Sequence, residues 1–112
     1  MRRLLAVHLA GAGLAVDEAE DGAELLARLR AGGDGYALLV TDVHMPRLSG
    51  LEAIRRAGEA ARVPTIVVTS FGDDEVHRKA EAMGALAVLD KPFDFDAFMA
   101  AVRGALPGLD GA

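Results

Sequence analysis

Several residues whose side chains can do chemistry stand at the ends of short apolar runs. They are an acidic pair, a single aspartate, two adjacent hydroxyls and a lysine: Glu20-Asp21, Asp42, Thr69-Ser70 and Lys91. A carboxylate that becomes an acyl phosphate must be an accessible nucleophile, and it needs a cation and hydroxyl or amide donors for the phosphoryl oxygens. Asp42, Lys91 and Thr69 could fill these roles. Each alone could equally be a turn residue, a surface charge or an ordinary strand residue.

The apolar runs before these residues predict four strands, 14–19, 36–41, 63–68 and 85–89. The runs 36–41 and 63–68 are nearly continuous in apolar residues, which is typical of parallel strands covered on both faces. Helical patterns predict five helices: from the N-terminus to Gly11, from Asp21 to Gly32, over Leu51–Ala61, from Asp73 to Gly84, and from Asp94 to Leu106. The predicted order of elements is therefore αβαβαβαβα.

Strands that alternate with helices through short connections predict an α/β fold, an open doubly wound parallel sheet with helices on both faces. The 112 residues suffice for one core, and we expect a single domain over residues 1–106 with a short tail at 107–112. Ligands bind such sheets outside the carboxyl ends of the strands. The chemistry-bearing residues therefore meet at one edge of the sheet.

Three ordered motifs together resemble the receiver domain of response regulators in two-component signalling. They are Asp42-Val43-His44-Met45-Pro46 with Gly50, then Val68-Thr69-Ser70, then Asp90-Lys91-Pro92-Phe93. The resemblance covers essentially the whole chain and implies a flavodoxin-like fold of the receiver type. It also implies that a histidine kinase or phosphotransfer protein donates the phosphoryl group and that a downstream protein partner receives the signal.

The resemblance assigns a role to each motif residue. Asp42 is the expected phosphoacceptor, Thr69 the switch hydroxyl and Lys91 the cation that pairs with the phosphoryl group. Asp42 and the backbone carbonyl of His44 are the expected Mg²⁺ ligands. The residues expected to shape the loops are Met45, Pro46, Gly50 and Pro92, and the Lys91-Pro92 bond is expected to be cis.

The chain departs from the family pattern in two places. Val88 stands where many receivers carry an aromatic residue, three positions before the lysine. Family members also begin with a central strand that ends in an acidic pair, whereas this chain starts within the helix that follows. We therefore expect the strands at 14–19 and 36–41 to lie about two strand spacings, roughly 9.6 Å, apart. We also expect Mg²⁺ binding to be weak or absent, because Glu20 and Asp21 are not expected to replace the pair.

Two other functions remain open. A phosphorylation-incompetent receiver that serves only as an interaction domain is favoured by the missing acidic pair. An aspartyl-nucleophile phosphatase would need a second carboxylate two residues after the nucleophile, where this chain has His44. The three histidines, His8, His44 and His77, are not expected to be phosphorylated, and we expect the domain not to be an enzyme.

Composition narrows the possible partners and compartments. The net charge is −5 and aromatic residues are scarce, which argues against direct binding of nucleic acid. Cysteine is absent, which is compatible with a reducing compartment. Two arginines before an apolar run imitate a secretory signal peptide, but His8 interrupts the run, and no apolar stretch approaches a membrane span of about 20 residues. We expect a cytoplasmic protein that does not contact a membrane.

Overall fold

The computed structural model describes residues 2–32, 36–42, 49–58, 63–70, 74–91 and 94–106. Among them, three parallel strands form one sheet in the order β1-β2-β3. The strands are β1 (Leu39–Asp42), β2 (Thr65–Ser70) and β3 (Ala87–Lys91). In the register, Asp42 pairs with Val68, and Val68 pairs with Leu89. The predicted α/β class with a parallel sheet is confirmed.

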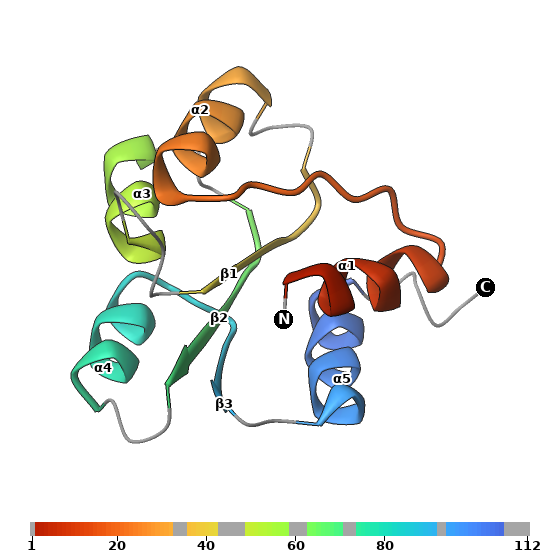
Figure 1. The fold of residues 1–112 in the computed structure, drawn as a ribbon. Coiled ribbons are helices and arrows are strands. Elements are labelled where there is room, and N and C mark those ends of the chain that lie inside the picture. Colours follow the sequence, from red (N-terminus) through yellow and green to blue (C-terminus); the bar gives the residue numbers. More distant parts are fainter. Residues whose placement is uncertain are drawn as a thin grey trace.

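Helices cover both faces of this sheet (Figure 1). Their bounds are α1 (Arg2–Gly11), α2 (Gly22–Gly32), α3 (Gly50–Ala57), α4 (Asp74–Ala82) and α5 (Phe95–Ala105). Figure 1 shows α1 and α5 on one side of the strands and α2, α3 and α4 on the other. None of the helices described is long and apolar enough to cross a membrane.

The core divides along the two faces of the sheet. Ile66 packs with Leu5 and Leu9 of α1 and with Phe98 and Val102 of α5. On the opposite face, one cluster joins Leu25, Leu29, Leu39 and Ala53, and a second joins Leu51, Val67 and Ala80. Alternate residues of a strand point to opposite faces, so Ile66 and Val67 serve different clusters. This alternation decides which helices each residue of β2 faces.

The strands begin and end later than the sequence pattern predicts. The strand predicted from residue 36 begins at Leu39, and the two later strands extend to Ser70 and Lys91. The reason is pairing with the neighbouring strand, since Thr69 pairs with Asp90 and Ser70 with Lys91. The hydroxyl pair and the lysine are therefore parts of the ladder rather than residues that follow it.

The predicted strand at 14–19 is wrong. These residues are described but form no strand, and the sheet ends at β1 on their side. A cavity of about 520 Å³ separates the segment from β1 and is lined from both sides, by Leu14 to Glu20 and by Tyr36 to Asp42. A strand exists only where a neighbour accepts and donates its backbone hydrogen bonds. The predicted gap between the two segments is present, and the sheet has not closed over it.

Aspartates cap two of the predicted helices at their starts. The carboxylate of Asp21 accepts the backbone N–H of Glu24 at 2.8 Å before α2, and that of Asp94 accepts the N–H of Ala97 at 2.6 Å before α5. The helix predicted over Leu51–Ala61 ends at Ala57, because Gly58 turns the chain with φ of 57°. Phe93 and Asp73 lie outside the described residues.

Candidate functional site

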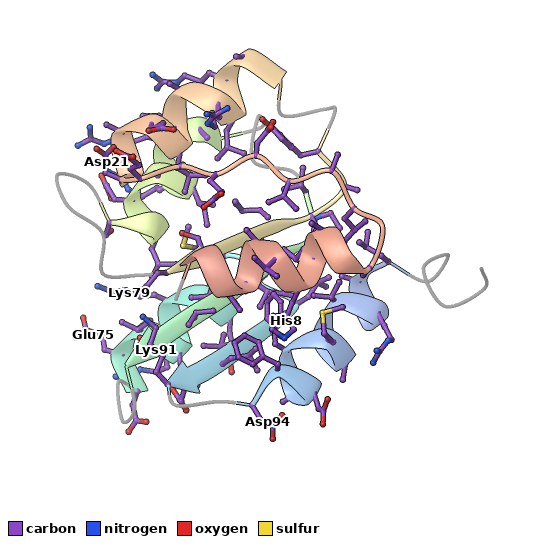
Figure 2. All side chains as sticks on the ribbon, turned by 45° about the vertical axis from the view of Figure 1, so that its right-hand side comes forward. His8, Asp21, Glu75, Lys79, Lys91 and Asp94 are labelled. Atoms are coloured by element: carbon purple, nitrogen blue, oxygen red, sulfur yellow. The ribbon has the colours of Figure 1, made fainter. Side chains whose placement is uncertain are left out.

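The carboxyl edge of the sheet brings Asp42 and Lys91 together. Lys91 Nζ donates to Asp42 Oδ2, and each side chain keeps 31% of its surface exposed. Figure 2 shows Lys91 near the end of β3 at this edge. Partly exposed ion pairs contribute only about 0–1 kcal/mol to stability. The pair is therefore better suited to binding an anion than to stabilising the fold.

The strand register explains how two residues on non-adjacent strands meet. Asp42 ends β1 and lies level with Val68 of β2 and Leu89 of β3. Lys91 stands two residues beyond Leu89, so it projects from the same face of the sheet as Asp42. The long lysine side chain then crosses the end of β2 to reach the carboxylate.

Thr69 is the fully buried hydroxyl of this edge. Its exposed fraction is 0%, and its Oγ1 has no hydrogen-bond partner among the residues that the structure describes. Because successive side chains of a strand point to opposite faces of the sheet, Thr69 lies on the same face as Val67, beneath α3 and α4. Asp42 lies on the other face, toward α1 and α5. A buried hydroxyl without a partner costs about 1–3 kcal/mol, and such a group in a native fold calls for an explanation.

The start of α3 packs tightly against the end of β1. A Cβ added at Gly50 would lie 2.5 Å from the carbonyl oxygen of Asp42 and would also collide with the side chain of Thr41. Thr41 Oγ1 in turn donates to that carbonyl at 3.1 Å. Ser49 caps α3 by accepting the N–H of Glu52 at 3.1 Å, so the start of the helix is fixed. The start of α3 lies so close to the end of β1 that only glycine fits at position 50.

Several of the predicted site residues fall outside the described residues. These are His44, Met45, Pro46 and Pro92, together with the Lys91-Pro92 bond. Glu20 and Asp21 are described: Glu20 lines the cavity that also reaches Asp42, and Asp21 caps α2. Within the described ranges, no group of three or more His, Asp or Glu side chains could hold a metal ion.

Sequence reasoning missed one pair of residues beside the site. His77 Nε2 of α4 lies 2.6 Å from Asp90 Oδ1 of β3, and this hydrogen bond raises the pKa of His77 above its usual 6.5. Asp90 belongs to the quoted lysine motif, but no role was assigned to it. Its place beside a helical histidine depends on how α4 packs, which sequence spacing does not reveal.

Known proteins provide an independent comparison. The family description "Response regulator receiver domain" matches residues 1–103. The transcriptional regulatory protein FixJ of Azorhizobium caulinodans is 40% identical over 108 residues, which are 95% of this chain and 50% of that protein. A protein-glutamate methylesterase/protein-glutamine glutaminase of Myxococcus xanthus is 38% identical over 84% of this chain and 28% of its own length. The chain thus spans half or less of these two relatives.

Solved structures agree with the sequence comparison. The crystal structure titled FixJ-N has a TM-score of 0.78 and 33% identity, and the match covers 93% of this chain and 82% of that one. The chemotaxis protein CheY4 of Vibrio cholerae has a TM-score of 0.80 and 26% identity, over 94% of this chain and 88% of that one. With its parallel sheet and the family match along nearly its whole length, this chain belongs to the response regulator receiver domain family.

Proposed function

We propose that this receiver domain accepts a phosphoryl group on Asp42 and passes the signal on through a conformational switch. The observation that carries the proposal is the Asp42–Lys91 pair at the carboxyl edge of the sheet, where a carboxylate nucleophile and its cation are both partly exposed. The donor is a histidine kinase or a phosphotransfer protein, and the receiver of the signal is a protein partner. We place the domain in the cytoplasm, where such kinases present their phosphohistidine.

The transfer is a simple substitution at phosphorus. A carboxylate oxygen of Asp42 forms the new P–O bond while the P–N bond of the donor phosphohistidine breaks, and the imidazole leaves with that electron pair and takes up a proton. The ammonium group of Lys91 already donates to the carboxylate of Asp42. It can therefore shift to a phosphoryl oxygen while it remains at the carboxyl edge of the sheet.

Thr69 supplies the proposed switch. A phosphoryl group on Asp42 extends past the ends of the strands, where side chains from either face of the sheet can reach it. Its oxygens can there accept a hydrogen bond from the hydroxyl of Thr69. That bond would satisfy a buried group that has no partner among the described residues. The gain favours an arrangement in which the end of β2 closes on the phosphoryl group.

A second function is favoured by one observation. In the part of the chain that the structure describes, the acceptor carboxylate is bonded to Lys91 and no cluster of metal-binding side chains surrounds it. This arrangement suits a phosphorylation-incompetent interaction domain. Under either proposal we infer that the domain is not an enzyme, because the position two residues after Asp42 holds His44 rather than the carboxylate that a phosphatase would use.

Labelling with a small phosphodonor separates the two functions. The chain is incubated with acetyl phosphate and Mg²⁺, and its intact mass is measured before and after treatment with hydroxylamine. We expect a gain of one phosphoryl group that hydroxylamine removes, and no gain in Asp42→Asn, since an amide is a poor nucleophile. Asp96→Asn, which changes an exposed carboxylate in the first turn of α5, should label like the wild type. No labelling of the wild type would favour the interaction domain.

A further inference from the structure

One polar contact ties α4 to β3. His77 Nε2 lies 2.6 Å from Asp90 Oδ1, and the two side chains are 30% and 36% exposed. Ala80 is the buried residue of this helix, and it packs with Val67 and Leu51, with Val76 and Val88 partly buried around them. Ala80 is thus the one buried residue of α4, so the polar contact adds to a small apolar interface between the helix and the sheet.

The charges around His77 come from two elements. Asp90 approaches from β3, while Asp74 and Glu81 approach from α4 itself, and all three favour the protonated ring. β2 presents the apolar Val67 and the buried Thr69 on this face. The hydrogen bond with Asp90 is the largest of the causes that raise the pKa of His77, and partial burial acts in the opposite direction.

Asp90 also occupies a position next to the candidate site. It is the register partner of Thr69 on β2, and it immediately precedes Lys91, whose side chain is bonded to Asp42. Residues next to each other in a strand face opposite sides, so Lys91 reaches the site while Asp90 reaches α4. Any change in how α4 holds Asp90 therefore acts on the strand that carries the lysine.

We propose that His77 and Asp90 form a proton-operated latch that fixes α4 against β3 when the imidazole is protonated and loosens the helix when it is not. This inference goes beyond the proposed phosphorylation and does not depend on it. Since the folded-state pKa of His77 is raised, the latch contributes its full stability below about pH 6.5, the unfolded value, and loses it as the pH rises through the folded value. Above that pH a neutral imidazole can still donate one hydrogen bond, but without the ion pair.

Two measurements on the unphosphorylated chain test the latch. The first is the titration of the His77 ring by NMR in the wild type and in Asp90→Asn. The second is amide hydrogen exchange in α4, expressed as protection factors and measured on either side of the His77 pKa. For each unit by which Asp90 raises that pKa, protection of α4 should change by up to about tenfold across the titration.

The variants decide the outcome. Asp90→Asn should lower the pKa of His77, and both Asp90→Asn and His77→Gln should make the protection of α4 independent of pH. Lys79→Gln is the matched control, because it breaks the 3.1 Å ion pair with Glu75 on the same helix; Figure 2 labels both residues. It should leave the pH dependence intact.

An unchanged His77 titration in Asp90→Asn, or protection of α4 that does not vary with pH in the wild type, would overturn the proposal. Neither result bears on labelling of Asp42.

Discussion

The ion pair of Asp42 with Lys91 joins two residues that lie 49 positions apart in the chain. The motifs predicted both residues and their common edge of the sheet. Lys91 contributes little to the fold, because its side chain remains partly exposed and its partner is a partly exposed carboxylate. Its contribution should therefore appear after phosphorylation rather than in folding.

We predict that Lys91→Ala lowers the free energy of unfolding by no more than about 1 kcal/mol, as expected for the loss of a partly exposed ion pair. The variant should accept label on Asp42 but should no longer change the NMR shifts of β3 and α4 on labelling. Circular dichroism follows melting, and a spectrum with and without phosphodonor follows the switch. Lys79→Ala, which removes an exposed lysine of α4, serves as the control. Global unfolding of Lys91→Ala would show that the lysine has a structural role instead.

Other residues could not be predicted in the same way. Thr69 was expected at the site, but that its hydroxyl is fully buried without a described partner follows only from the packing of α3 and α4 over β2. The His77–Asp90 contact depends on the rotation of α4 about its axis. Sequence motifs report which side chains share an edge of the sheet, whereas contacts between a helix and a strand depend on how the core packs.

The position of α3 depends on the contact of its first residue with the end of β1. We predict that Gly50→Ala destabilises the domain by about 1–3 kcal/mol, because the new Cβ would collide with Thr41 and the carbonyl of Asp42. It should also slow labelling of Asp42, whose backbone would have to shift. Denaturant unfolding and a labelling time course measure the two effects.

Gly104→Ala is the matched control for this substitution. Gly104 lies in α5 with nothing within 4 Å of its added Cβ, so alanine should stabilise the domain by up to about 1 kcal/mol through helix propensity. If Gly50→Ala were as stable as the wild type, the close approach of α3 to β1 would not exist in solution.

Elements with strong local signals were predicted well, and the one that depends on a neighbour was not. The capping of α2 by Asp21 and of α5 by Asp94 follows from residues within one turn of the helix start. The segment 14–19 has the apolar pattern of a strand but no partner to pair with, because the cavity lies between it and β1. The later ends of β2 and β3 have the same origin, since the ladder decides where a strand stops.

The cavity beside β1 is lined by Asp17, Glu18 and Glu20 on one side and reaches Asp42 on the other. We predict that a short apolar strand ending in two acidic residues, added ahead of Met1, raises the melting temperature and makes labelling of Asp42 depend on Mg²⁺. Each apolar side chain that it buries would contribute about 1.5–3 kcal/mol, and the two carboxylates would supply the charge that Mg²⁺ requires.

A Gly/Ser extension of equal length is the control, because it can neither fill the cavity nor bind the ion. Calorimetry and labelling with and without Mg²⁺ compare the three chains. Equal melting temperatures and equal labelling in all three would show that the cavity has no bearing on the fold or on the site.

Chemical identification of the phosphorylated residue tests whether Asp42 is the phosphoacceptor. After incubation with acetyl phosphate, reduction with borohydride converts an aspartyl phosphate to homoserine, and peptide mass spectrometry identifies the altered residue. The Asp42–Lys91 geometry predicts conversion at Asp42 and at no other carboxylate, with none in Asp42→Asn. Conversion at another aspartate, or a labelled chain in which Asp42 is unaltered, would show that Asp42 is not the phosphoacceptor.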